Sequence, residues 1–225
     1  MTTATRKPAS SSQRALNELR EKIFAGELAA GSDHLESELA DLLNMSRTPI
    51  REAVLTLESQ GLLELRPRKG VRISPLSPED MAEIYDVLTE LESLAAERAA
   101  SAGHDEAELQ ELAIAISDMD VALASSDLEA WAEADDRFHQ ELVRLGGNSR
   151  IVMIVNMMSD QVRRARATTL FMRPVPTKSN EDHRKVYQAI AEGDFEMARN
   201  THREHRQHAK RIIVELLNRN RLRFL

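Results

Sequence analysis

The stretch Glu36–Gly61, ESELADLLNMSRTPIREAVLTLESQG, decides the fold of the first part of this chain. Its apolar residues recur at helical spacing in two short runs that are separated at Asn44-Met45, which predicts two helices meeting at a tight turn. Ser46 can cap the second helix, and Pro49 fits its first turn, where a missing N–H costs little. The stretch therefore predicts a helix-turn-helix.

The second helix has an apolar face that we expect to be buried: Ile50, Ala53, Val54 and Leu57. Arg47, Thr48 and Arg51 then lie at its exposed N-terminal end, as in a recognition helix that enters the DNA major groove. The alternative is an ordinary amphipathic helix pair, because such pairs are common in helical proteins.

The residues after Gly61 favour the DNA-binding interpretation. An alternating run at 62–65 predicts a strand, the basic segment RPRKG at 66–70 predicts a turn, and 71–73 predicts a second strand. Upstream, apolar residues at helical spacing predict a helix that ends at Gly26. Residues 13–74 are therefore expected to form a winged helix-turn-helix with a two-stranded wing, after a disordered tail at 1–12.

Three motifs in this part resemble the DNA-binding domain of the GntR family of bacterial transcription regulators: GELAAG at 26–31, SRTPIREAV at 46–54 and RKG at 68–70. One departure is Ser37, where several members carry an arginine that contacts DNA. The resemblance implies an operator interface at Ser46, Arg47, Thr48 and Arg51, completed by Arg68, Lys69 and Gly70 of the wing.

Composition limits the class of protein. A chain of 225 residues is long enough for two domains, and its 42% hydrophobic and 30% charged residues are typical of a globular protein. It has no cysteine, which excludes disulfides and thiolate metal ligands. The N-terminus lacks the apolar segment of a signal peptide, and the most apolar run, 151–158, is too short to span a bilayer. We therefore expect a cytoplasmic protein without a membrane partner.

The net charge of −7 is unevenly distributed. Residues 1–75 contain 11 Lys and Arg against 10 Asp and Glu, a balance of +1, and the rest of the chain contains 19 against 27, a balance of −8. The acidic excess therefore lies in the second part. A near-neutral first part can still bind DNA where its arginines cluster.

Prolines at 75 and 78 mark a linker, and residues 79–220 are expected to form an all-α domain. Apolar periodicity predicts six antiparallel helices, at 77–102, 105–124, 127–145, 148–172, 179–192 and 194–220. In the first of them the expected apolar face is Ile84, Val87, Leu91, Leu94 and Ala95. The whole chain is thus predicted to be mostly α-helical.

Four polar residues are predicted to point into this bundle. Asp135 and His139 are four apart on an apolar face, His183 is in phase with buried positions of its helix, and so is His205. Each alone could be a hydrogen-bonded core residue, and His202 could replace His205 if the helix were rotated. Together they form the ligand set of a divalent metal site with open positions.

The same residues resemble the metal-binding ligand domain (FCD) of the FadR-type branch of GntR regulators. The resemblance implies a divalent ion (zinc first, with nickel or manganese as alternatives), a small carboxylate effector and a homodimer. Leu88 departs from it, because many members carry an arginine there. A replacement cation for the effector could come from Arg163 or Arg166, unless these arginines face solvent or pair with acidic neighbours.

The sequence thus predicts a transcription regulator, most often a repressor in this family, that binds a pseudo-palindromic DNA operator as a homodimer. A regulator that responds to the metal itself needs the same ligands and stays an alternative. A metalloenzyme is the third hypothesis. We expect no enzyme, since no inward-facing glutamate or second base is apparent near the ligands.

Overall fold

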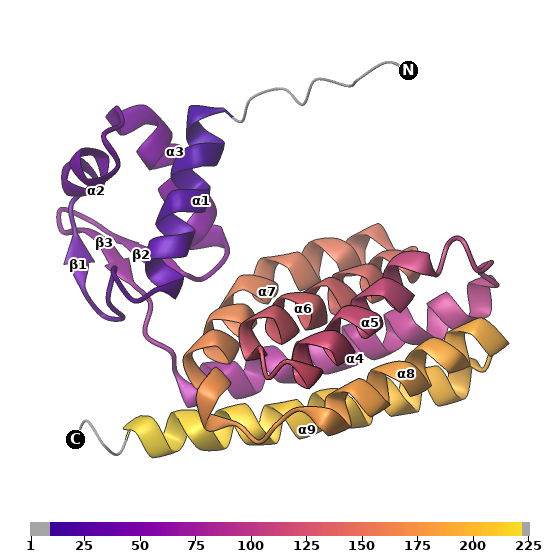
Figure 1. Ribbon diagram of the computed structural model, residues 1–225. Coiled ribbons are helices and arrows are strands. Elements are labelled where there is room, and N and C mark those ends of the chain that lie inside the picture. Colours follow the sequence, from indigo (N-terminus) through magenta and orange to yellow (C-terminus); the bar gives the residue numbers. More distant parts are fainter. Residues whose placement is uncertain (1–9, 222–225) are drawn as a thin grey trace. The chain divides into compact units, whose positions relative to one another are not determined.

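A computed structural model describes residues 10–221, so residues 1–9 of the predicted tail lie outside the described part. The chain divides into two compact units, one ending at Pro75 and one beginning at Leu76. The described residues of the first unit form six elements (Figure 1): α1 (Ser11–Phe24), β1 (Asp33–His34), α2 (Glu36–Leu43), α3 (Arg47–Ser59), β2 (Leu63–Arg66) and β3 (Gly70–Ile73).

Helix α1 begins earlier than predicted. The Ser10 hydroxyl accepts a hydrogen bond of 3.1 Å from the backbone N–H of Gln13, so it caps the helix before Ser11. The predicted disordered tail is therefore wrong for Ser11 and Ser12. The apolar face of the helix buries Ala15, Leu19 and Ile23 in the core shared with α3.

The wing contains a strand that the sequence pattern did not predict. Strands β2 and β3 pair antiparallel as expected, but β1 pairs with the free edge of β3 and places Asp33 opposite Arg72. A two-residue strand is too short to show alternation, which is why periodicity missed it. Gly70 permits this sheet: its φ is 85°, and a Cβ there would lie 2.3 Å from the carbonyl oxygen of His34.

The described part of the second unit is the predicted helical bundle: α4 (Pro78–Ala102), α5 (Gln110–Ala124), α6 (Leu128–Leu145), α7 (Ser149–Thr169) with the 3-10 turn η1 (Leu170–Met172), α8 (Thr177–Glu192) and α9 (Phe195–Arg221). These elements and the winged helix-turn-helix confirm the mostly α fold. None of the described helices combines the length and the hydrophobicity that a membrane span requires.

Two helix boundaries of the bundle differ from the prediction by three residues or more. Helix α5 begins at Gln110 rather than near residue 105, because Asp105 and Glu108 each accept a hydrogen bond from the other's backbone N–H and form a turn of their own. Helix α7 ends at Thr169 and tightens into η1. Both differences follow from local hydrogen bonds that apolar spacing does not register.

Helix α4 lies at the centre of the bundle, where it contacts α6, α7, α8 and α9 (Figure 1). The predicted face is only partly right: Ala95 is buried, Ile84, Leu91 and Leu94 are partly buried, and Val87 is exposed. The fully buried face lies to one side of it and comprises Met81, Tyr85, Leu88, Thr89, Glu92, Ser93, Ala95, Ala96, Ala99 and Ala100. The small residues of this face allow close packing. At Gly146, a Cβ would lie 2.8 Å from the Cα of Ala95.

Candidate functional site

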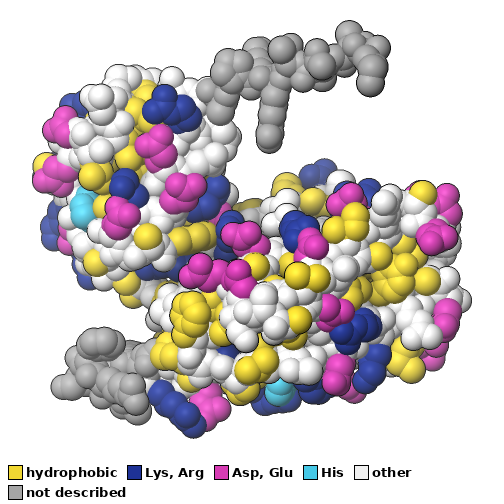
Figure 2. Space-filling view, in the orientation of Figure 1, with side chains coloured by type: hydrophobic (Ala, Val, Ile, Leu, Met, Phe, Trp, Pro, Cys, Tyr) yellow, Lys and Arg dark blue, Asp and Glu magenta, His cyan; other side chains and the backbone are white. Residues whose placement is uncertain are grey.

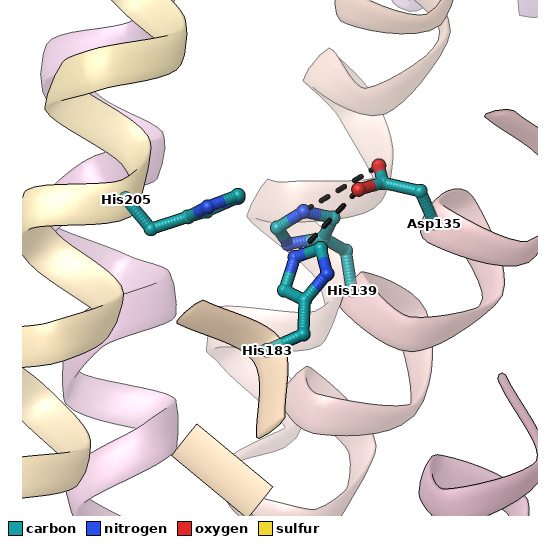
Figure 3. A group of neighbouring side chains, drawn as sticks. All are labelled: Asp135, His139, His183 and His205. Atoms are coloured by element: carbon teal, nitrogen blue, oxygen red, sulfur yellow. Dashed lines mark ion pairs between the residues drawn. The ribbon is translucent and has the colours of Figure 1, made fainter. Parts of the chain in front are cut away.

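The four predicted metal ligands come together inside the second unit. Asp135 and His139 lie one turn apart on α6, His183 lies on α8 and His205 on α9, and their side chains converge (Figure 3). All four are buried, and each offers one ligand atom within 4.8 Å of the others. Helical phase on three separate helices therefore places one carboxylate and three imidazoles around one point.

His183 shows most clearly that this cluster suits a cation. Its side chain is 0% exposed, and neither ring nitrogen has a hydrogen-bond partner among the described residues. Burial, reinforced by the neighbouring histidines, holds its pKa well below the usual value, so the ring is neutral. An unpaired buried polar atom costs about 1–3 kcal/mol, and a metal ion on a ring nitrogen would remove one such cost.

The other two ligand histidines are also neutral. Burial lowers the pKa of His139 to about 4, although Glu92 partly opposes the shift. Burial likewise lowers the pKa of His205 to about 3, opposed by its hydrogen bond with Asp182. Neutral imidazole is the form that binds divalent ions, so the donor set fits a zinc, nickel or manganese ion with positions left for other oxygen ligands.

Arg166, a predicted effector contact, is buried against the cluster. Its guanidinium pairs with Asp135 and donates a 2.9 Å hydrogen bond to Asp136. Arg163 is half-exposed and lies 3.3 Å from the same Asp136 carboxylate. Burial raises the pKa of Asp136 to about 6 against the effect of Arg163. Both arginines thus have acidic partners, one of the arrangements expected from the sequence.

The expectation that no glutamate faces the ligands is wrong. Glu92 on α4 is 2% exposed and accepts hydrogen bonds from His139 Nδ1 at 2.9 Å and His202 Nε2 at 3.0 Å. Its other oxygen lies 3.2 Å from Arg206. Burial would raise its pKa, but Arg206 and the histidines outweigh this and hold the pKa well below its usual value. The sequence held one signal for its burial: Glu92 lies at helical spacing from Tyr85 and Leu88, so the three residues share one face of the helix.

Arg206 was missed as an interior residue, and His202, which was expected to face the ligands only if the helix were rotated, is also interior. Both are buried on α9, and Arg206 lies over the Tyr85 ring, 4.7 Å from its centroid. On the same helix, Arg199, Arg203 and Lys210 pair with acidic residues of α4. These pairs exist because α9 packs along α4.

A cavity of about 210 Å³ opens beside the histidine cluster. Its lining includes apolar residues, among them Leu88, the position at which many relatives are expected to carry an arginine. It also includes His139, three arginines (Arg163, Arg166 and Arg206) and three carboxylates (Glu92, Asp136 and Asp160). The cavity therefore offers both apolar surface and guanidinium groups to a small molecule.

In the first unit, the predicted DNA contacts lie on the surface. Arg47, Thr48 and Arg51 are exposed on the first turns of α3, after a turn in which Asn44 adopts the left-handed φ of 50°. The helix N-terminus adds a partial positive charge to these arginines. Ser46 precedes the helix as predicted, but its side chain forms no capping hydrogen bond, so its hydroxyl does not serve as the expected cap.

The wing carries its predicted residues at the tip of the turn. Arg68 has a φ of 65° and is exposed, as is Lys69, next to Gly70. Arg66 and Arg72, farther along the strands, instead pair with Asp33 of β1. On the visible face of this unit, basic and acidic side chains are interspersed (Figure 2), which agrees with its near-neutral balance.

Comparisons with known proteins define the class. Residues 11–73 match the family described as bacterial regulatory proteins, gntR family, and residues 83–208 match the FCD domain. These two domains define a transcription regulator with an N-terminal DNA-binding domain and a C-terminal ligand-binding domain. The chain belongs to the GntR family and carries the FCD domain.

Individual relatives agree with this assignment. The chain is 32% identical over 187 residues to an HTH-type transcriptional regulator in an unstable DNA locus of Streptomyces ambofaciens, covering 83% of this chain and 78% of the relative. It is 31% identical over 177 residues to the "Probable D-xylose utilization operon transcriptional repressor" of Paenarthrobacter nicotinovorans, covering 79% and 77%. The solved structure of E. coli McbR/YncC, 22% identical, has the same fold with a TM-score of 0.76 over 93% of this chain and 99% of that one.

Proposed function

We propose that this regulator is a repressor that binds its operator as a homodimer, and that a small carboxylate, held at a divalent metal ion in the helical unit, controls its affinity for DNA. The observation that carries the proposal is the cavity beside the metal-ligand cluster, which joins His139 to three arginines. A hard metal ion and guanidinium groups both prefer negatively charged oxygen ligands. A carboxylate or hydroxy acid is therefore the favoured effector.

The first unit would read the operator through α3. Arg47 and Arg51 are exposed and form no ion pairs among the described residues, so both can contact bases or phosphates. Ser46 and Thr48 offer hydroxyls near the same helix end. Arg68, Lys69 and Gly70 of the wing would lie against the backbone or the minor groove. One such unit covers few base pairs, which favours a dimer on a pseudo-palindromic site.

In the helical unit, Asp135, His139, His183 and His205 would hold the ion, and Arg166 with Arg163 would contact the effector carboxylate. Arg166 now pairs with Asp135 and Asp136. A bound cation would compensate the Asp135 charge. The guanidinium N–H groups that now pair with Asp135 could then donate to an anionic ligand. The ion and the effector would therefore bind cooperatively.

A second cavity, of about 310 Å³, is the competing location for an effector. It lies among Trp131, Leu170 and the loop before α8, and none of the four predicted ligands lines it. Its walls are mainly apolar, and its two cations, Arg173 and Lys178, already donate hydrogen bonds to the Arg166 carbonyl and to Asp182. It therefore offers less to a carboxylate than a cavity beside a metal ion would. The proposed effector site is therefore the smaller cavity.

Binding measurements with DNA test the proposal. An operator selected from random-sequence DNA would be titrated with protein, first stripped of metal, then with Zn²⁺, then with Zn²⁺ and candidate hydroxy, sugar and dicarboxylic acids. We expect an acid to weaken DNA binding only when the metal is present. Release by Zn²⁺ alone would instead establish the metal as the signal.

Arginine variants locate the effector. Arg163→Met should weaken the response to the acid while preserving operator binding without effector. Arg150→Met is the matched control, because Arg150 lies exposed on the same helix and does not line the cavity. An unchanged acid response in Arg163→Met, combined with a loss after filling the larger cavity by Leu170→Trp, would place the effector in that cavity instead.

A further inference from the structure

The buried carboxylate of Glu92 lies behind the predicted metal centre and engages two histidines at once. Its Oε2 atom is 2.9 Å from His139 Nδ1 and 3.0 Å from His202 Nε2, and all three residues are at most 8% exposed. They come from α4, α6 and α9, so the contact joins three helices. Only His139 belongs to the predicted ligand set.

The direction of these hydrogen bonds follows from chemistry. An ionised carboxylate can only accept, so His139 donates from Nδ1 and His202 donates from Nε2. A neutral His139 ring with its proton on Nδ1 has a free lone pair on Nε2. That Nε2 atom lies on the Asp135 side, 3.7 Å from Asp135 Oδ2. The contact with Glu92 thus leaves the unprotonated nitrogen directed toward the ligand cluster.

Glu92, His139 and His202 also satisfy the spacing of a metal site by themselves, because their ligand atoms lie within 4.8 Å of one another. The charge nearby argues against an ion there. The Arg206 guanidinium lies 3.2 Å from Glu92 Oε1 and is itself buried, so a second cation would be repelled in a poorly solvated interior. Glu92 is therefore better suited to orient a ligand than to be one.

We infer that Glu92 and His202 are positioning residues for the metal centre: Glu92 fixes the tautomer and ring orientation of His139, and His202 holds the Glu92 carboxylate in place. This inference rests on the proposed metal site. His202 uses Nε2 for Glu92, so it is not available through that atom as a substitute for His205. The arrangement is a carboxylate–histidine–metal relay, whose outer partners tune metal affinity.

Metal titration of the full chain tests the inference. The affinity for Zn²⁺ would be measured by competition with a chromophoric chelator, and the visible spectrum of the Co²⁺-loaded protein would report ligand orientation. Wild type should bind one Zn²⁺ ion per chain. Glu92→Gln should weaken Zn²⁺ binding about 10–100-fold and alter the Co²⁺ spectrum. His202→Leu, which keeps the Glu92–His139 hydrogen bond, should cause a smaller loss of Zn²⁺ affinity. It replaces Glu92→Gln as the test if that variant does not fold.

Glu97→Gln is the matched control, because Glu97 also lies on α4 and pairs with Arg199 of α9 but is away from the ligands. It should bind Zn²⁺ like wild type. Wild-type affinity and spectrum in folded Glu92→Gln and His202→Leu would overturn the inference and leave the metal site intact. A second bound ion in wild type that is lost in Glu92→Gln would also overturn it. Absence of Zn²⁺ binding by wild type would refute the proposed metal site itself.

Discussion

Replacing His183 with leucine should make the metal-free bundle more stable. His183→Leu removes two buried nitrogen atoms that lack hydrogen-bond partners, each costing about 1–3 kcal/mol. It loses the ring contact with Phe138, whose centroid is 4.1 Å away, worth about 0.5–1.5 kcal/mol, and changes the packing by up to about 1.5 kcal/mol. The expected net gain is about 2 kcal/mol.

Zn²⁺ should reverse this order. At a free concentration of about 1,000 times Kd, the ion adds about 4.1 kcal/mol to the wild-type free energy of unfolding. His183→Leu lacks one ligand and should gain little. Wild type is therefore expected to be about 2 kcal/mol less stable than the variant in chelator and about 2 kcal/mol more stable in Zn²⁺.

Urea unfolding followed by tryptophan fluorescence measures both values. Trp131 is the single tryptophan of the chain, is 2% exposed and lies in the helical unit, so it reports the bundle alone. His208→Leu is the control, since His208 is a half-buried histidine of α9 outside the ligand set. If His183→Leu were destabilised by the same amount with and without Zn²⁺, His183 would be an ordinary core residue and the reasoning would be refuted.

Four further predictions follow from the structure. Arg51→Ala should weaken operator binding and flatten base preference by about 1–3 kcal/mol, whereas Lys69→Ala should weaken all sequences alike; intact preference among operator variants in Arg51→Ala would exclude α3 as the reading helix. Gly70→Ala should destabilise the first unit by about 1–3 kcal/mol in thermal unfolding, because the residue has a positive φ and faces a carbonyl; an unchanged midpoint would contradict the strand pairing. The free energy of unfolding of the metal-free bundle, measured in urea, should fall as the pH is lowered from about 6.5 toward about 4. Over this range the unfolded chain binds protons that native His139 and His205, with pKa values of about 4 and about 3, do not bind. A free energy of unfolding that did not change over this range would show that these rings are not buried as neutral groups. Sedimentation at micromolar concentration should show a dimer, and a footprint of one half-site by a monomer would rule out the two-fold arrangement.

Local sequence determined the helix-turn-helix, the wing turn and the six bundle helices. Caps such as Ser77 and Asp127, with apolar spacing of 3.6 residues, act over a few residues and are visible in the chain itself. The same periodicity placed Asp135 and His139 on one face of α6. It also placed His183 and His205 on the buried faces of their helices, and together with the family resemblance this predicted the cluster.

Tertiary structure decided which of two competing faces α4 buries. The chain offers an aliphatic face that includes Val87 and a second face with Tyr85, Glu92 and small residues. Packing against four neighbouring helices buried the second face fully, whereas most of the first is only partly buried and Val87 is exposed. That choice buried Glu92 beside His139 and Arg206. Likewise, β1 exists only because β3 supplies a partner edge from a distant part of the chain. Periodicity fixes relative directions within one helix, but the rotation of a helix against its neighbours depends on side chains that are far apart in sequence.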